Sequence, residues 1–135
     1  MIQYLLDTDT CIYWLKGRTP VRERLLPVGW SEISICSITV AELYFGAYNS
    51  SRIPENLATA DQFISSISVL PLGNNTLKNF GKLKAQLRQQ GKPIADFDLL
   101  IASVALSEKL ILVTNNTRHY ERIFGLNLEN WMNAT

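Results

Sequence analysis

The sequence has few of the residues that bind zinc or form disulfides. It contains one histidine, His119, and two cysteines, Cys11 and Cys36, in 135 residues. The cysteines lack the spacing of a metal-binding pair, and His119 has no second histidine with which to share a metal. These absences exclude a His/Cys zinc centre and a disulfide framework. We predict that both thiols are small buried side chains in a reducing compartment, with a single disulfide as the alternative.

Long apolar runs and strong charge of either sign are absent as well. No run approaches the roughly 18 apolar residues of a membrane-spanning helix. The opening residues, MIQYLLDTD, lack the basic and apolar regions of a secretory signal, which predicts a cytoplasmic protein. The formal net charge of +1 excludes a highly basic coat protein and an acidic disordered tail. The length and the 47% hydrophobic content predict one domain over residues 1–135.

Acidic residues are missing from one long stretch of the chain, between Asp61 and Asp96. The basic residues of this stretch are Lys78, Lys82, Lys84, Arg88 and Lys92. This segregation allows a nucleic-acid substrate despite the near-neutral total charge, because local positive charge can steer a phosphate backbone. The alternative is an ordinary solvated helix face.

Strand and helix patterns alternate along the chain. Buried strands are predicted at residues 2–6, 33–38 and 110–114, with weaker patterns at 68–72 and 126–129. Helices are predicted at residues 8–16, 39–48, 56–67, 75–90 and 98–107. The first and third strands are continuous apolar runs, which are typical of a parallel sheet covered on both faces. The pattern therefore predicts an α/β domain with a mostly parallel central sheet between helical layers.

Acidic residues occur where the predicted strands give way to helices. Asp7 directly follows the first strand, and Glu42 falls in the first turn of the helix after the second strand. Asp98 opens the apolar helix at residues 98–107. The carboxyl ends of parallel strands lie along one edge of a sheet, where such folds place their sites. We therefore predict that these three carboxylates meet at that edge.

Helix capping is the alternative explanation for each acid. The three residues after Asp7 can all cap the following helix, so Asp7 is one acid more than capping requires. Thr39 and Glu42 match a capping box, in which the carboxylate folds back on the helix N-terminus. One of Asp96 and Asp98 is enough to cap the apolar helix, and Asp98 is the better placed to face a site.

A cluster of carboxylates favours a bound cation. Carboxylates that lie close together repel one another, and some would stay protonated unless a cation neutralised them. Ligands that are all oxygen, without histidine or cysteine, select hard ions such as Mg²⁺ or Mn²⁺ over Zn²⁺. The acids after the strands therefore predict a site for such an ion.

Four stretches carry a family resemblance. They are LLDTDTCIYWLKG at 5–17, ICSITVAELYFGA at 35–47, KLKAQLRQQGKPIADFDLLIASVAL at 82–106 and LVTNNTRHYERIFGLNLENW at 112–131. In these residues and their order, the chain resembles the PIN-domain ribonucleases, and specifically the VapC toxins of bacterial toxin–antitoxin pairs. The resemblance runs the whole length of the chain and implies a three-layer α/β/α PIN-like fold.

The resemblance also implies a set of catalytic residues. It makes Asp7, Glu42 and Asp98 the metal-binding acids, with Mg²⁺ as the ion and Mn²⁺ as a substitute. Asn116 takes the fourth catalytic position, where many PIN domains have an acid. Because a neutral amide is a weaker ligand than a carboxylate, the number of bound ions, one or two, stays open.

Neighbouring polar residues have lesser implied roles. Asp9 stands where relatives often have asparagine, which implies a local hydrogen-bonding role. Thr114 and Asn115 are implied to support the metal-binding acids, and Asp96 lies outside the family pattern.

The implied activity is the hydrolysis of an RNA phosphodiester bond, assisted by the metal ion. Among relatives the substrate is a tRNA cut in its anticodon loop or a ribosomal RNA loop, and initiator tRNA is the leading expectation here. The implied partners are a second copy of the chain and a small antitoxin whose C-terminal segment reaches towards the acids. Trp14, Tyr44 and Tyr48 are interface candidates, although core packing explains each equally well.

Two other classes share part of the first motif. LLDTDT fits the Asp-x-Asp-x-Thr signature of haloacid-dehalogenase-like phosphohydrolases, whose last strand usually ends in acids, whereas the strand at 110–114 ends in Asn115 and Asn116. A receiver-like module would need an acid after its third strand, and SVLPLG at 68–73 has none. A phosphomonoester assay separates the phosphohydrolase from the nuclease.

Overall fold

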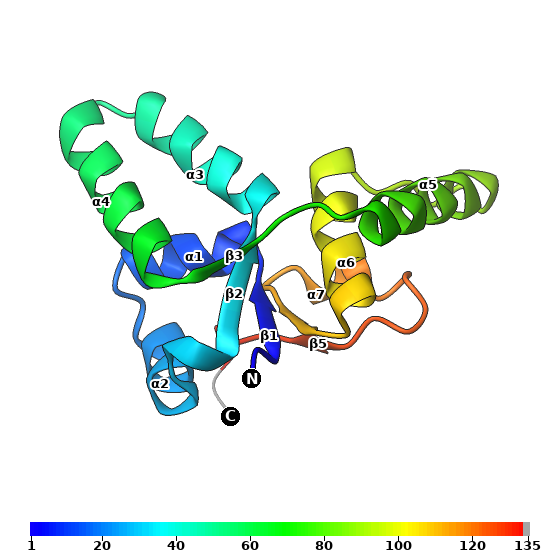
Figure 1. Cartoon of the computed structure of the whole chain (residues 1–135), viewed down its shortest axis with the longest axis horizontal. Helices are drawn as coiled ribbons and strands as arrows, with labels where there is room; N and C mark the ends of the chain where they lie inside the picture. Colours follow the sequence, from blue (N-terminus) through cyan, green and yellow to red (C-terminus); the bar gives the residue numbers. More distant parts are fainter. Residues whose placement is uncertain (134–135) are drawn as a thin grey trace.

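A parallel five-stranded sheet organises the molecule (Figure 1). The computed structural model describes residues 1–133. The strands are β1 (Tyr4–Leu6), β2 (Ile33–Cys36), β3 (Ser68–Leu70), β4 (Ile111–Val113) and β5 (Leu128–Glu129), in the order β3-β2-β1-β4-β5. Every pair of neighbouring strands is parallel. The continuous apolar runs therefore predicted the sheet type correctly.

Helices connect the strands and cover both faces of the sheet. They are α1 (Thr8–Leu15), α2 (Thr19–Val28), the 3-10 helix η1 (Trp30–Glu32), α3 (Ser37–Tyr48), α4 (Ile53–Ser66), α5 (Asn74–Gln89), α6 (Asp96–Glu108) and α7 (Thr117–Tyr120). Figure 1 shows α1–α4 towards one end of the molecule and α5–α7 towards the other. None of the helices in the described part of the chain is both long and apolar enough to span a bilayer.

The central strand β1 separates two hydrophobic cores. Successive side chains of a strand point to opposite faces, and Leu5 and Leu6 are both fully buried. Leu5 packs in a cluster with side chains of α5 and α6, including Leu87 and Leu99. Leu6 belongs to the other cluster, which includes Phe63 of α4. The predicted arrangement of a sheet between two helical layers is confirmed.

Two helices, α2 and α7, escaped the sequence prediction. The α2 segment, TPVRERLLPV, contains a proline near its end, and only Val21 and Leu25 of it are buried. It therefore carries too little apolar periodicity to stand out. The α7 helix has four residues, which is too short for any helical period to be read.

The two cysteines behave as predicted from their rarity. Cys11 of α1 and Cys36 of β2 are free and fully buried. Both pack as small apolar side chains, on opposite faces of the sheet. The alternative of a disulfide between them is wrong.

Candidate functional site at the carboxyl edge of the sheet

The site begins where β1 ends. β2 and β3 lie on one side of β1, and β4 and β5 lie on the other, so the chain changes direction beside β1. Open parallel sheets hold their ligands at such a switch point. The Asp7 backbone N–H donates to the carbonyl of Val113 at 2.9 Å, which joins the ends of β1 and β4. The backbone therefore fixes Asp7 at this point of the edge.

The Asp7 side chain is buried and surrounded by donors. It is 6% exposed, and its Oδ1 accepts a hydrogen bond from the Thr8 backbone at 2.8 Å. Its Oδ2 accepts from the Thr114 hydroxyl at 2.8 Å and from the Tyr120 hydroxyl at 3.1 Å. These bonds explain how a carboxylate is tolerated at 6% exposure, and they fix its orientation.

The electrostatics of Asp7 favour a cation. Burial is the main effect that raises the pKa of Asp7 to about 7, and the nearby charges of Asp9 and, more weakly, Asp98 contribute to the same rise. The two hydrogen bonds from Thr114 and Thr8 lower the pKa but do not offset these effects. A positive ion would stabilise the charged form of a carboxyl group that is buried beside other carboxylates, so the residues fit a divalent metal.

Asp9 supports the loop that follows β4. Its Oδ2 accepts from the Asn115 backbone at 3.0 Å and lies 3.4 Å from the Thr114 hydroxyl, and its Oδ1 accepts from Thr10 at 3.2 Å. Burial raises the pKa of Asp9 as well. The geometry agrees with a local hydrogen-bonding role for Asp9, Thr114 and Asn115.

Glu42 is connected to the segment of Asp7 and does not cap its own helix. Helix α3 begins at Ser37, with Cys36 at the N-cap position and no side-chain cap bond. Thr39 therefore lies inside the helix, and the predicted capping box is wrong. The Thr8 hydroxyl donates to Glu42 Oε1 at 2.6 Å and lies 3.1 Å from the Thr39 hydroxyl. Glu42 therefore binds Thr8 of α1 instead of the N-terminus of its own helix.

Asp98 lies beside a half-buried histidine. Its Oδ2 is 3.4 Å from Nε2 of His119, and the Asp98 side chain is 35% exposed. That nitrogen of His119 is buried without a hydrogen-bond partner in the described part of the chain. Asp96, by contrast, pairs with Lys84 at 2.9 Å on the surface. Neither acid caps α6, whose N-cap residue is Ala95, so the capping expectation for this helix is also wrong.

Asn116 lies at the rim of the site. It is exposed and occupies the N-cap position of α7, where its side chain makes no cap bond. Its backbone N–H donates to the Thr114 hydroxyl at 3.1 Å. Asn116 is therefore connected to Asp7 through Thr114, while its amide side chain stays available.

The side chains converge without forming a closed ligand set. Within residues 1–133, no three His, Cys, Asp or Glu side chains are arranged as a ready metal site. Asp98 affects the pKa of Asp7, whereas Glu42 is linked to it through Thr8. All the oxygens come from carboxylate, hydroxyl and amide groups, which is the donor chemistry of a hard cation.

The sequence alone does not predict that three further residues contribute to the site. The sequence pattern marks Thr8 only as a possible cap of the following helix, whereas its hydroxyl binds Glu42. His119 and Tyr120 lie in the short α7, where periodicity gives no signal. The only available clue was that His119 is the single histidine of the chain.

Comparisons with known proteins agree with this geometry. The family model of the PIN domain matches residues 4–124. The tRNA(fMet)-specific endonuclease VapC of Shigella flexneri is 40% identical over 132 residues, which cover 97% of this chain and 99% of that protein. A crystal structure of DNA-bound VapBC from Salmonella typhimurium contains a chain that superimposes with a TM-score of 0.91 at 39% identity, covering 97% of this chain and 99% of that one. VapBC2 of Rickettsia felis, bound to a promoter DNA fragment, gives 0.89 at 36% identity, with 97% and 99% covered.

Proposed function

Because the chain belongs to the PIN-domain family and, within it, to the VapC proteins, we propose that it is a metal-dependent endoribonuclease. In this proposal it is the toxin of a toxin–antitoxin pair. The observation that carries the proposal is Asp7, a buried carboxylate at the switch point of the sheet with two further acids close enough to raise its pKa. Two cores on either side of one sheet support a single domain over residues 1–135.

The metal ligands we propose are Asp7, Glu42 and Asp98, with Asn116 as a neutral fourth catalytic residue. When bound, Mg²⁺, or Mn²⁺ in its place, supplies a Lewis acid for a phosphate oxygen and lowers the pKa of a water for in-line attack. The protein's own part is orientation. Thr114 and Tyr120 hold Asp7 Oδ2 in place, because each donates a hydroxyl proton to it.

RNA is the proposed substrate, and tRNA is the favoured class. The name of the Shigella flexneri relative specifies initiator tRNA, which supports the same substrate class for this chain; cleavage in the anticodon loop is proposed from the family resemblance alone. The proposed place of action is the cytoplasm, where such an RNA is found. Lys78, Lys82 and Arg88 of α5 are available to steer the RNA backbone.

The proposed partners are a small antitoxin and a second copy of the chain. VapBC complexes are known for relatives. In this chain a groove of about 420 Å³ runs between α1, α3 and α4, and Glu42 lies among its apolar lining residues. An inhibitory segment seated in that groove would reach the acids.

The aromatic residues proposed for interfaces differ in their surroundings. Tyr48 is 63% exposed and stays an interface candidate. Trp14 is half-buried, with its ring 5.3 Å from that of Trp30, and the Tyr44 hydroxyl donates to Asp61 at 2.6 Å. Both of these residues are therefore engaged within the chain.

A cleavage assay tests the proposed function. Purified protein is incubated with an initiator tRNA transcript and Mg²⁺, and a parallel reaction contains EDTA. We expect one or a few discrete cuts with Mg²⁺ and none with EDTA. Turnover of p-nitrophenyl phosphate without RNA cleavage would contradict the proposal and favour the phosphohydrolase class.

A further inference from the structure

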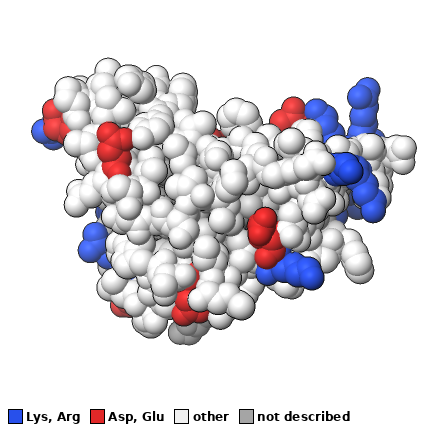
Figure 2. Space-filling model, in the orientation of Figure 1, with Lys and Arg blue, Asp and Glu red and all other residues white. Residues whose placement is uncertain are grey.

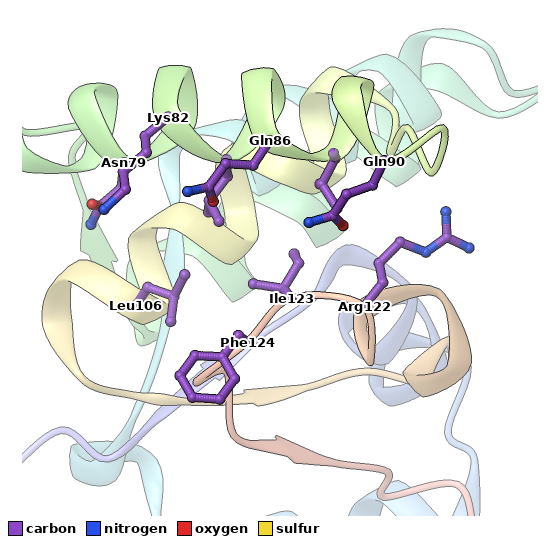
Figure 3. Close-up of a pocket in the computed structure, with 10 residues that line it drawn as sticks. Asn79, Lys82, Gln86, Gln90, Leu106, Arg122, Ile123 and Phe124 are labelled. Carbon is purple, nitrogen blue, oxygen red and sulfur yellow. The ribbon is translucent and has the colours of Figure 1, made fainter.

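A second hollow lies outside the acidic site, between α5 and the loop that follows α7 (Figure 3). Its volume is about 520 Å³. The floor is apolar, formed by side chains such as Leu87 and Ile123, each 3% exposed. A hollow of this size accepts a group as large as a nucleobase with its sugar, and its apolar floor favours a flat ring.

The walls of this hollow carry groups that can bind a base. Figure 3 shows the amide ends of Gln86 and Gln90 pointing from α5 towards the loop that carries Ile123 and Phe124. Both glutamines are exposed, and an amide supplies a donor and an acceptor to a base edge. Phe124 is 99% exposed. A phenyl ring held in water at the mouth of a hollow is a stacking surface without its partner.

The charge around the hollow is positive. Lys82 and Arg122 contribute to its lining. The ion pairs that the structure shows within residues 1–133 use Arg24, Arg52, Lys84 and His119, so Lys82 and Arg122 keep their charge uncompensated. Figure 2 shows basic side chains gathered at the end of the molecule where α5 lies. The positive charge at this end of the molecule therefore favours a polyanionic ligand over a neutral one.

One end of the hollow is linked to the acidic site through the chain. Tyr120, which donates to Asp7, precedes Arg122 by two residues, so their Cα atoms lie within about 7 Å of each other. The Arg122 guanidinium donates to the carbonyl of Pro93 at 3.1 Å, in the connection that leads to α6 and Asp98. Arg122 therefore joins the lining of the hollow to the segment that leads to Asp98.

We propose that the hollow between α5 and the Phe124 loop binds an unpaired nucleotide of the RNA substrate, with Phe124 stacking on the base and Arg122 binding a phosphate. The proposal rests on the proposed ribonuclease function and adds a second contact to it. An unpaired nucleotide fits better than a duplex, because bases in an A-form helix do not offer their faces for stacking. Gln86 and Gln90 then contact the base edge.

Binding is measured in the Asp98→Asn background, so that the RNA stays intact. The probes are a labelled initiator tRNA transcript and a 12-nucleotide single-stranded RNA, read by fluorescence anisotropy. We expect Phe124→Ala to weaken binding of the single-stranded probe about 5- to 100-fold, the range of one lost base–aromatic stack, whereas Phe124→Tyr binds as before. Leu26→Ala, which truncates an exposed apolar side chain of α2, is the matched control and leaves affinity unchanged.

The salt dependence of RNA binding measures the contribution of the Arg122 charge. Arg122→Gln should reduce the slope of log affinity against log salt by about one. Arg52→Gln removes the same charge from an exposed side chain of the α4 end, and it should leave the slope unchanged. A 5-iodouridine RNA provides a test without any variant, since irradiation should crosslink it to the peptide that contains Phe124.

The outcomes separate this site from the proposed activity. Equal affinity of Phe124→Ala and the Leu26→Ala control, or crosslinks only elsewhere, would overturn the proposed nucleotide site while leaving cleavage untouched. Phe124-dependent RNA binding by a wild type that cuts no RNA would overturn the nuclease and keep the site. If Phe124→Ala instead weakens binding of a co-expressed protein partner and not of RNA, the hollow is a protein-docking site and the proposal is wrong.

Discussion

Asp7 and Asp98 lie at the same edge of the sheet, yet the protein holds them in opposite ways. Asp7 belongs to a closed half of the site, where it is 6% exposed and accepts hydrogen bonds from Thr114 and Tyr120. Asp98 belongs to an open half, where its side chain is 35% exposed and lies 3.4 Å from His119. The comparison teaches that two carboxylates at one edge can depend on the protein to different degrees: Asp7 needs the hydroxyls of Thr114 and Tyr120 in place of water, whereas Asp98 stays partly in contact with water.

The largest expected effect comes from removing either charge. Asp7→Asn and Asp98→Asn should each reduce RNA cleavage at least about 100-fold, which corresponds to about 2.7 kcal/mol of transition-state stabilisation. Only Asp7→Asn should raise the melting temperature at pH 7.5 without metal, because it removes a buried charge while the Thr114 and Tyr120 hydroxyls can turn to accept from the new amide. Cleavage rates and thermal denaturation of both variants check this. Full activity in either variant would remove that residue from the site.

Glu42 is the next acid to test. Glu42→Gln keeps the side-chain volume and a hydrogen-bonding group for Thr8, but it removes a proposed ligand charge. We expect activity to fall about 10- to 100-fold, the loss typical of weakened metal binding, with the melting temperature within about 2 °C of wild type. Thr39→Ser, which keeps a hydroxyl beside Thr8, is the control and stays active. A fully active Glu42→Gln protein would show that Glu42 serves only to position α1 against α3.

The closed half should also make stability depend on pH. The pKa of Asp7 is about 7 in the folded protein against 3.8 for an ordinary aspartate, so the folded state keeps a proton that the unfolded chain releases. This contribution to the free energy of unfolding is complete below about pH 4 and is lost as the pH rises through 7, at up to about 1.4 kcal/mol per pH unit.

Urea denaturation in EDTA between pH 4.5 and pH 8 measures this loss. Asp7→Asn should flatten the profile, whereas Asp98→Asn should change it only slightly, because Asp98 is the weakest contributor to the pKa shift of Asp7. Mg²⁺ should restore stability at pH 8 in the wild type. A wild-type profile as flat as that of Asp7→Asn would refute the closed-half description.

The smallest expected effect is a gain at the rim. Asn116→Asp adds a charged oxygen next to the proposed ion and should tighten Mg²⁺ binding several-fold in a calorimetric titration. Asn115→Asp places the same charge one residue away, where the backbone N–H already binds Asp9, and should give no such gain. Unchanged affinity and stoichiometry for Asn116→Asp would mean that Asn116 only stabilises the turn and that the site is limited to the three acids.

The sequence predicted the framework of the site better than its contacts. Continuous apolar runs and acids after strands are regular signals, so they placed Asp7 at the correct edge of a parallel sheet. The capping box at Thr39 and Glu42 was read from local spacing, whereas the contact with Thr8 depends on where α1 packs against α3. No local pattern specifies such a contact between distant segments.

Distance along the chain explains the other omissions. Thr114 and Tyr120 reach Asp7 from more than 100 residues away. Only the pairing of β1 with β4 brings them together. Their roles follow from strand order, which alternating strands and helices leave open.

The pairing of β1 with β4 also sets when the protein can become harmful during synthesis. β1 pairs with β2, 29 residues later, but its other neighbour begins at Ile111. Until those last residues leave the ribosome, Asp7 lacks Thr114 and Tyr120, and an early fragment cannot assemble the closed half of the site. Because chains emerge at about 5–20 residues per second, several seconds pass between the synthesis of Asp7 and that of Tyr120. A partner that acts on the folded protein would therefore meet a nuclease whose site is complete only after β4 and α7 have been made.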